Sequence, residues 1–405
     1  MMMRILLSTI GSRGDVQPLV ALGLQLKELG QDVRLCVPPD FREWIEGLGL
    51  PVTPIGPELR STGKSNPMAA RPTPEQIRQM MEGTVATQFE TITDAAKGCD
   101  LIVGATALQI AAPSIAEKMG IPYFFAAYCP AVLPSPRHAP PVLPMLGDKP
   151  MTMTDYSELW TQDAQRWNTQ WRDILNSHRT RLGLAPVSDV RSHILTDQPW
   201  LASDPMLGPW DDPEDKSVFQ TGAWIVKDER PLDPELESFL DAGEPPIFFG
   251  FGSISAPQGL SQAMIASARA LGRRAILLHG WADLSLLDNE PDCIAISEAN
   301  YQLLFKRVAA IVHHGGAGTT HAATRSGAPQ VVIPQHYDQP YWAGRVQKLG
   351  IGVTHTLNTP TVDSLTNALE QALQPDVIAR AQSSATEIRT DGALIAAQRL
   401  MNAVH

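Results

Sequence analysis

The stretch IVHHGGAGTTHAATRSGAPQVVIP (residues 311–334) joins an apolar run to a glycine turn, a helix-like segment and a second apolar run. The two runs are short and rich in Val and Ile, which is typical of buried parallel strands. Parallel neighbours need a crossover between them, and a helix usually provides it. The stretch therefore predicts a βαβ unit, and with it an α/β fold in this half of the chain.

Apolar runs of this kind alternate with helix-period segments along the whole sequence. In the first half the runs are RILLSTI (4–10), DVRLCV (32–37), DLIVG (100–104), PYFFAAY (122–128) and PWLAS (199–203). In the second half they are PPIFFGFGS (245–253), RAILLHG (274–280), CIAIS (293–297), AAIVHHGG (309–316) and PQVVIP (329–334). A chain of 405 residues exceeds the roughly 250–300 that one core supports. We predict two doubly wound, Rossmann-like domains that face each other across a cleft.

The segment GAWIVKDERPLDPELESFLDAGEPP (222–246) is rich in Pro, Asp and Glu and marks the linker. The predicted boundaries are an N-terminal domain at 1–221, the linker at 222–245 and a C-terminal domain from 246 to 375.

Composition narrows the class of protein. The net charge of −11 argues against a nucleic-acid partner, which would need clustered Lys and Arg. The four cysteines form no C-x-x-C pair, so free thiols in a reducing compartment are expected. The sequence has no leader pattern and no apolar segment of 18 residues, which predicts a soluble cytoplasmic protein with no integral membrane association.

The glycine turn at 315–318 predicts an anion site. Free backbone N–H groups at the start of the following helix, together with its dipole, favour negative charge. The threonine hydroxyls and one imidazole of the histidine pair can add donors. The alternative is a tight turn with capping threonines. The candidate residues are His313, His314, Gly315, Gly316, Gly318, Thr319 and Thr320.

A second candidate pair, Asp338 and Gln339, follows the strand-like run PQVVIP within HYDQPYWAGRV (336–346). A carboxylate beside an amide offers acceptors and donors to vicinal hydroxyls. Alternatively, Asp338 caps the helix at 340–349. The first interpretation requires a ligand that carries both a phosphate and a polyol.

The opening strand and helix, LLSTIGSRGDVQPLVALGLQLKELG (6–30), enclose a glycine loop that lacks the G-x-G-x-x-G pattern. Together with HHGGAGTTHAATRSGAPQ and PQHYDQPYWAGR, the stretch GSRGDVQPLVAL resembles the two-domain, inverting, nucleotide-sugar-dependent glycosyltransferases of the GT-B fold. Within that family the chain is most similar to the vancomycin-type glycopeptide antibiotic group, with similarity to the sterol glucosyltransferases. ATQFE (86–90) and LNSHR (175–179) also resemble the glycopeptide branch.

The resemblance implies an acceptor site in the N-terminal half, a UDP- or dTDP-sugar in the C-terminal half, and a final helix, within 376–405, that crosses back to the first domain. Asp15 matches the proposed general base, which takes a proton from the acceptor hydroxyl. Ser12 and Arg13 would shape the loop or contact the acceptor, and Ser253 would approach the diphosphate. The alternative is that Asp15 is an N-cap, with Pro18 in the first helical turn.

The reaction implied is a metal-independent displacement without a cofactor, by a monomer or weak dimer. Many members of the family carry a W-x-P-Q motif whose tryptophan stacks on the nucleotide base. The matching stretch here, SEANYQLLF (297–305), lacks that aromatic residue, so the sequence does not distinguish uridine from thymidine. Segments 55–75 and 130–150 are expected to form the acceptor site. The acceptor is a glycopeptide aglycone or pseudoaglycone, or alternatively a sterol or another lipophilic or phenolic molecule. A nucleotide-sugar 2-epimerase and a non-catalytic nucleotide-sugar-binding protein are more distant alternatives.

Overall fold

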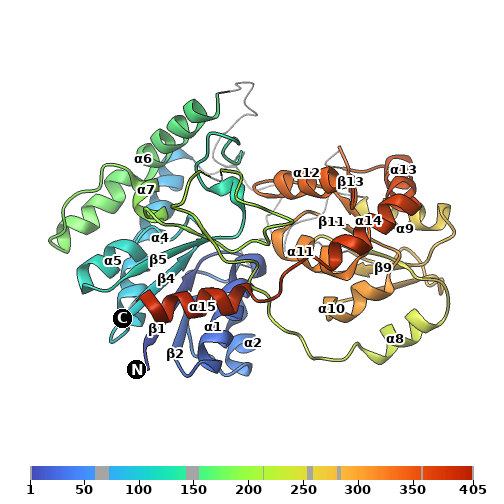
Figure 1. Cartoon of the computed structure of the whole chain (residues 1–405), viewed down its shortest axis with the longest axis horizontal. Helices are drawn as coiled ribbons and strands as arrows, with labels where there is room; N and C mark the ends of the chain where they lie inside the picture. The colour runs from blue at the N-terminus through green and yellow to red at the C-terminus, as the bar shows by residue number, and fades with distance from the viewer. Residues whose placement is uncertain are drawn as a thin grey trace.

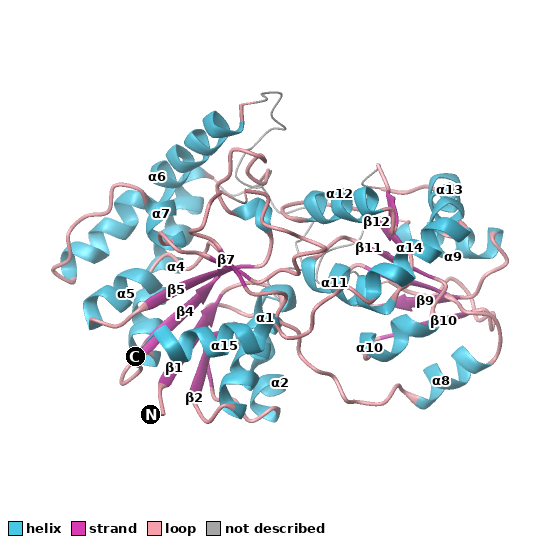
Figure 2. Cartoon of the chain, viewed as in Figure 1, coloured by secondary structure: helices cyan, strands magenta, loops and turns pink. Residues whose placement is uncertain are grey.

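The computed structural model describes residues 2–59, 73–142, 155–212, 214–252, 259–280, 284–356 and 359–403. In this part of the chain two parallel sheets form two lobes, each with helices packed on its sheet (Figure 1 and Figure 2). The predicted pair of doubly wound α/β domains is confirmed. No helix among the described residues is both long and apolar enough to span a membrane.

The N-terminal sheet has seven strands in the order β3-β2-β1-β4-β5-β6-β7, and each neighbouring pair is parallel. The strands are β1 (Arg4–Thr9), β2 (Asp32–Val37), β3 (Val52–Pro54), β4 (Leu101–Ala105), β5 (Tyr123–Ala127), β6 (Trp200–Leu201) and β7 (Phe219–Gln220). The helices are α1 (Arg13–Glu28), α2 (Arg42–Gly47), α4 (Pro74–Ala95), α5 (Ala112–Met119), α6 (Tyr156–Arg181) and α7 (Val190–Leu195).

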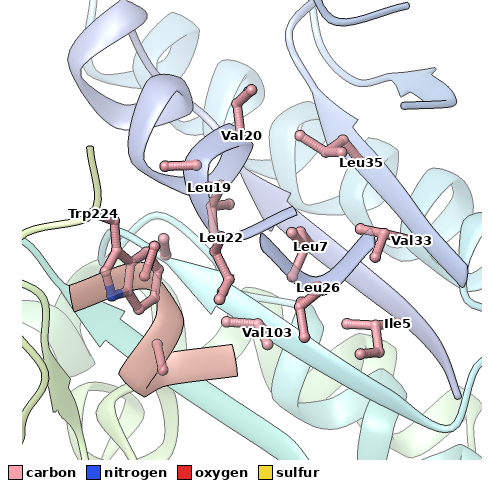
Figure 3. Close-up of a cluster of buried hydrophobic side chains, with 14 of the residues drawn as sticks. Ile5, Leu7, Leu19, Val20, Leu22, Leu26, Val33, Leu35, Val103 and Trp224 are labelled. Carbon is pink, nitrogen blue, oxygen red and sulfur yellow. The ribbon is translucent and has the colours of Figure 1, made fainter. Parts of the chain in front are cut away.

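Helix α1 buries one face against β1 and β2. Its side chains Leu19, Leu22 and Leu26 are fully buried, and Figure 3 shows them directed toward Leu7 and Val33 of the sheet. The spacing of these leucines places them on one side of a helix, which is why this segment packs as it does. Burial of each leucine stabilises the fold by about 1.5–3 kcal/mol. The loop between β1 and α1 is therefore anchored at both ends by a packed core.

The C-terminal sheet has six strands in the order β10-β9-β8-β11-β12-β13, again all parallel. They are β8 (Ile247–Gly250), β9 (Ala275–Leu278), β10 (Cys293–Ile296), β11 (Ala310–His313), β12 (Gln330–Val332) and β13 (Gly352–Thr354). The helices of this half are α8 (Pro234–Asp241), α9 (Leu260–Ala270), α10 (Tyr301–Leu304), α11 (Ala317–Ser326), α12 (Gln339–Leu349), α13 (Val362–Ala372) and α14 (Pro375–Ala385).

The predicted final helix is two helices in the structure. Helix α14 stays on the C-terminal lobe beside α11, and only α15 (Gly392–Ala403) crosses to pack against α1 (Figure 1). The break lies at 386–391, where the backbone N–H of Arg389 donates to the Asp204 carboxylate at 2.8 Å. Because this N–H group donates to Asp204, it cannot also donate to a carbonyl within a continuous helix.

The linker meets α15 at one point. Gly222, which follows β7, has φ +95, and a Cβ on Gly392 would lie 2.4 Å from its carbonyl oxygen. Only glycine permits this approach of two backbones. Trp224 then belongs to the N-terminal core, whereas Leu236 on α8 belongs to the C-terminal core. The two chain crossings between the lobes therefore touch each other.

A buried cluster also joins the domains directly. Leu207, which follows β6, packs with Trp342 and Val346 of α12, and Trp342 is fully buried. Arg345 of α12 donates to the carbonyl oxygens of Leu207 and Met206 at 2.7 and 3.0 Å. Residues after the carboxyl ends of strands in one sheet thus pack on a helix of the other.

Candidate active site

The loop after β1 places the Asp15 carboxylate at the start of α1. Ser12 is the N-cap, and Asp15 Oδ2 accepts hydrogen bonds from the Ser12 backbone N–H at 2.7 Å and from Ser12 Oγ at 3.2 Å. This is a capping box, so the alternative with Asp15 itself as N-cap is wrong. Helix α1 begins earlier than expected, at Arg13, and Pro18 lies inside the helix instead of in its first turn. The capping box holds the carboxylate in one orientation.

Two further residues fix this loop. Gly11 has φ +148, a conformation that side chains other than glycine rarely adopt. The phenol of Tyr128, which follows β5, donates to the backbone carbonyl of Asp15 at 3.1 Å. Tyr128 was not predicted from the sequence, because it is distant in the chain from the loop and no motif links the two.

We expect Gly11→Ala to displace Asp15. A Cβ at Gly11 would lie 2.2 Å from Asp15 Oδ2, so the carboxylate must move, and the backbone is strained as well. Activity should fall at least tenfold and stability by about 1–3 kcal/mol. Steady-state kinetics and urea unfolding measure the two effects. Gly30→Ala, at φ +78 with no neighbouring atom within 4 Å, is the matched control: it adds the backbone strain alone and should leave kcat unchanged. Full activity in Gly11→Ala would contradict this role for the glycine.

Asp338 interacts electrostatically with Asp15 from the opposite domain. Burial raises the pKa of Asp338 to about 7; a hydrogen bond from Trp342 Nε1, at 3.0 Å, opposes the rise, and the charge of Asp15 adds to it. Burial likewise raises the pKa of Asp15 to about 6, against the lowering effect of the Ser12 hydrogen bonds. Asp338 is the N-cap residue of α12, but its side chain makes no capping hydrogen bond. The charge of Asp15 therefore influences Asp338 across the boundary between the domains.

These pKa values predict an acidic limb in the pH profile. In the predicted role of general base Asp15 must be deprotonated, so kcat/KM should level off above about pH 7 and fall about tenfold per pH unit below pH 6. Folding stability should change in the opposite sense. The pKa of Asp15 is higher in the folded chain than its ordinary 3.8, so stability falls as the pH rises from about 4 through 6. A rate that is constant between pH 5 and 8 would contradict the assignment.

The two histidines at the end of β11 differ in whether a ring nitrogen is left to bond a ligand. His313 is fully buried; its Nδ1 accepts from the Gly315 N–H at 3.1 Å, and its Nε2 lies 3.0 Å from Gln330 Oε1. Burial lowers the pKa of His313 to about 4, against the Gln330 hydrogen bond. Both ring nitrogens are therefore used within the protein. Of the predicted pair, His314 is the residue that can reach a ligand.

His314 lies between two glycines. A Cβ on Gly316 would be 2.5 Å from its Nε2, and one on Gly252 would be 2.9 Å from its Cε1. Burial lowers the pKa of His314 to about 3; His313 and His336 add to this, and the Gly250 carbonyl opposes it. No described group has hydrogen-bonding geometry to the buried Nδ1. His314 is thus a neutral imidazole beside the start of α11.

Helix α11 begins without a side-chain cap. Its N-cap is Gly316, and among the described residues no side chain accepts a capping hydrogen bond from the first N–H groups. The Thr320 hydroxyl donates to the Gly316 carbonyl at 2.9 Å and so points into the helix, whereas Thr319 is half-buried and Gly318 exposed. The predicted anion site therefore consists of backbone N–H groups, His314 and Thr319.

The other predicted donor-binding residues lie around this site. Gln339 is buried, and its Oε1 accepts from the backbone N–H groups of Gln335 and His336 at 2.8 and 3.1 Å. Only its amide donors remain for a hydroxyl. Gly315, at φ +90, packs its backbone against Gln339 and links the two motifs. Ser253 lies outside the described residues, as do parts of both segments expected to bind the acceptor.

Arg13 contacts residues of both domains. Its guanidinium lies 4.7 Å from the Trp44 ring centroid, and its Nη1 is 2.9 Å from Glu298 Oε1 of the C-terminal domain. Glu298 was not singled out from the sequence. Asn300 holds the linker, with its amide donating to the carbonyls of Asp228 and Arg230 at 2.9 and 2.7 Å. The segment expected to meet the nucleotide base is therefore tied to the linker and to the loop of Asp15.

Comparisons with known proteins agree with this arrangement. Residues 5–135 match the model of the glycosyltransferase family 28 N-terminal domain, and residues 262–394 match that of the erythromycin biosynthesis protein CIII-like C-terminal domain. The solved glycosyltransferase of kitacinnamycin has a TM-score of 0.74 at 20% identity, covering 99% of each chain. This fold and this site define a two-domain glycosyltransferase of the GT-B type.

Relatives with known activities are similar over the full length. The chain is 50% identical to the vancomycin aglycone glucosyltransferase of Amycolatopsis orientalis, over 99% of this chain and 98% of that protein. It is 43% identical to the dTDP-epi-vancosaminyltransferase of the same organism, with the same coverage. The chain belongs to the glycosyltransferase family of these vancomycin-type enzymes, as its sequence motifs predicted.

Proposed function

We propose that this protein transfers a sugar from a UDP- or dTDP-sugar to a hydroxyl of a glycopeptide antibiotic aglycone or pseudoaglycone. The observation that carries the proposal is the fixed orientation of the Asp15 carboxylate by Ser12, at 2.7 and 3.2 Å, on a loop that reaches the second domain through the Arg13–Glu298 ion pair at 2.9 Å. Asp15 would then serve as the base for the acceptor, and Asp338, whose pKa responds to the charge of Asp15, as the carboxylate for the sugar. The names of the two full-length relatives, a glucosyltransferase and a vancosaminyltransferase, support the acceptor class.

In the proposed reaction the Asp15 carboxylate takes the proton of the acceptor hydroxyl as its oxygen attacks the anomeric carbon. The carbon–oxygen bond to the nucleoside diphosphate breaks on the opposite face, so the configuration inverts. Asp338 accepts from sugar hydroxyls, and the Gln339 amide donates to them. General base catalysis contributes about 10²–10⁴ to the rate.

Negative charge grows on the departing diphosphate. In the proposed complex it lies against the N–H groups at the start of α11, which no described side chain caps, and against the neutral imidazole of His314; both sets of donors are held by the fold before the reaction. These donors can provide the stabilisation that a metal ion provides in other transferases, which is why we propose a metal-independent reaction without a cofactor. Asp15, Asp338 and His314 come from one chain, so a monomer or weak dimer suffices.

Mass spectrometry of acceptor products tests this function. The protein is incubated with UDP-glucose, UDP-N-acetylglucosamine or a dTDP-deoxysugar and with a vancomycin-type aglycone, a sterol or a simple phenol. We expect the mass of one sugar to be added to the aglycone. Glycosylation of the sterol or the phenol alone would show that the acceptor is a lipophilic or phenolic small molecule and not a glycopeptide aglycone. No product from any pair, with nucleotide binding intact, would favour an epimerase or a binding protein.

A further inference from the structure

Arg13 and Glu298 form an ion pair that crosses from the acceptor domain to the donor domain. Arg13 is the first residue of α1, next to the capping box that orients Asp15. Glu298 follows β10 in the segment where the nucleotide base is expected. Their charged atoms are 2.9 Å apart, and the side chains are 40% and 49% exposed. The contact is therefore direct but open to solvent.

The Arg13 side chain is held in position before it reaches Glu298. Its guanidinium stacks on Trp44, and its Nε donates to Gln17 Oε1 at 3.3 Å. Both partners belong to the N-terminal domain. A guanidinium restrained in this way loses less side-chain entropy when it pairs, so the pair forms more readily than one between two free side chains. These contacts also leave Arg13 directed at the other domain and not at an acceptor.

Glu298 is held equally well on its side. Its second carboxylate oxygen lies 3.3 Å from Nη1 of Arg230 in the linker, and Arg230 also pairs with Asp228 at 2.8 Å. Gln302, on the following helix, donates to the linker carbonyl of Val226 at 2.8 Å. The segment around Glu298 is therefore bonded to the linker at more than one point.

We propose that Arg13 is a positioning residue, which through Glu298 sets the loop of Asp15 against the segment that meets the nucleotide base. The inference rests on the proposed function and replaces a direct contact between Arg13 and the acceptor. When the pair is formed, the base loop and the donor segment are held together, and transfer proceeds. When it opens, the two domains separate at this edge and Asp15 no longer faces the donor sugar.

A double-mutant cycle tests this inference. Arg13→Met keeps the aliphatic stem over Trp44, and Glu298→Gln keeps the shape of the carboxylate. We expect each to lower kcat about three- to fivefold, in keeping with an exposed ion pair, and the double variant to be no slower than the slower single. The acceptor KM and the affinity for UDP or dTDP should stay within about twofold. Arg42→Met breaks an exposed pair with Glu46 at 2.9 Å inside α2 and is the matched control.

Two further measurements separate this proposal from its alternatives. Salt screens an exposed pair, so raising ionic strength from about 0.05 M to about 0.5 M should slow the native enzyme more than the variants. In small-angle scattering without acceptor, the radius of gyration should be larger for the two single variants and the double variant than for the native protein. For the control variant it should be unchanged. A raised acceptor KM in Arg13→Met, with Glu298→Gln unaffected, would overturn the proposal in favour of acceptor binding. Unchanged scattering would also overturn it, and that readout holds even if no transfer product is ever found.

Discussion

Asp15→Asn lowers kcat for sugar transfer at least 100-fold, while the affinity for UDP or dTDP stays within about twofold. This result is expected because the amide cannot take the proton of the attacking hydroxyl, and general base catalysis contributes about 10²–10⁴ to the rate. The amide oxygen can still accept from the Ser12 backbone N–H, which is now 2.7 Å from the carboxylate, so the capping box largely survives. The loss is then one of chemistry and not of folding. Kinetics and calorimetry on the same preparation measure both quantities.

A helix cap elsewhere provides the control. Thr361 caps α13 through a hydrogen bond from Ser364 N at 3.1 Å, far along the chain from the site. Thr361→Ala should cost about 1 kcal/mol of stability and leave kcat unchanged. If Asp15→Asn behaved like Thr361→Ala, with lower stability and an unaltered rate, the residue would be structural only and the proposed mechanism would lose its base.

The second large effect is expected at His314. His314→Ala should lower kcat by about 10²–10³, as the loss of one preorganised donor to a developing oxyanion does elsewhere. The affinity for the nucleoside diphosphate should fall as well, because we propose that the same imidazole contacts the product. Burial keeps the pKa of His314 at about 3, so this contribution should not titrate between about pH 5 and 9. His314→Gln, which keeps a side-chain N–H donor, should recover part of the rate.

His355 is the matched control for this variant. It is a buried histidine of the same domain that follows β13 and lies 2.9 Å from Ser364 Oγ. His355→Ala should lower stability with kcat preserved. Nucleotide affinity in His314→Ala equal to that of the native protein would show that the diphosphate does not lie against this imidazole.

The central strands and the edge strand β10 were predictable from sequence, whereas the three shortest edge strands were not. Runs such as those of β1, β4 and β11 are continuous and apolar because both faces of a central parallel strand are buried. The unpredicted strands β3, β7 and β13 each have three residues or fewer, and each lies at an edge of its sheet. Strands of two or three residues are too short to leave a hydrophobic period in the sequence, whereas the four-residue edge strand β10 left the apolar run CIAIS.

The site was predictable where a motif is local. The glycine turn before α11 and the Asp338–Gln339 pair each follow a strand directly, so the fold alone brings them to the same edge of the sheet. Tyr128, Trp342 and Glu298 were missed for a physical reason. Tyr128 reaches the loop of Asp15 only once the first domain has folded, whereas the contacts of Glu298 with Arg13 and of Trp342 with Leu207 form only once both domains have packed. In the case of Trp342, its position four residues after Asp338 in a helical segment was a usable signal.

The crossing of α15 also has a consequence for synthesis on the ribosome. The N-terminal core includes Ala396 and Leu400 of α15, which pack in the same cluster as Leu19 and Trp224. The hydrophobic face beside α1 therefore stays open until the last helix has emerged. At roughly 5–20 residues per second, the chain between the end of the first sheet and α15 takes about ten to thirty seconds to make. During that interval the first domain is an incomplete folding unit, and it depends on chaperones or on its own charge to remain free of aggregates. A fragment that ends at the linker would keep this defect permanently.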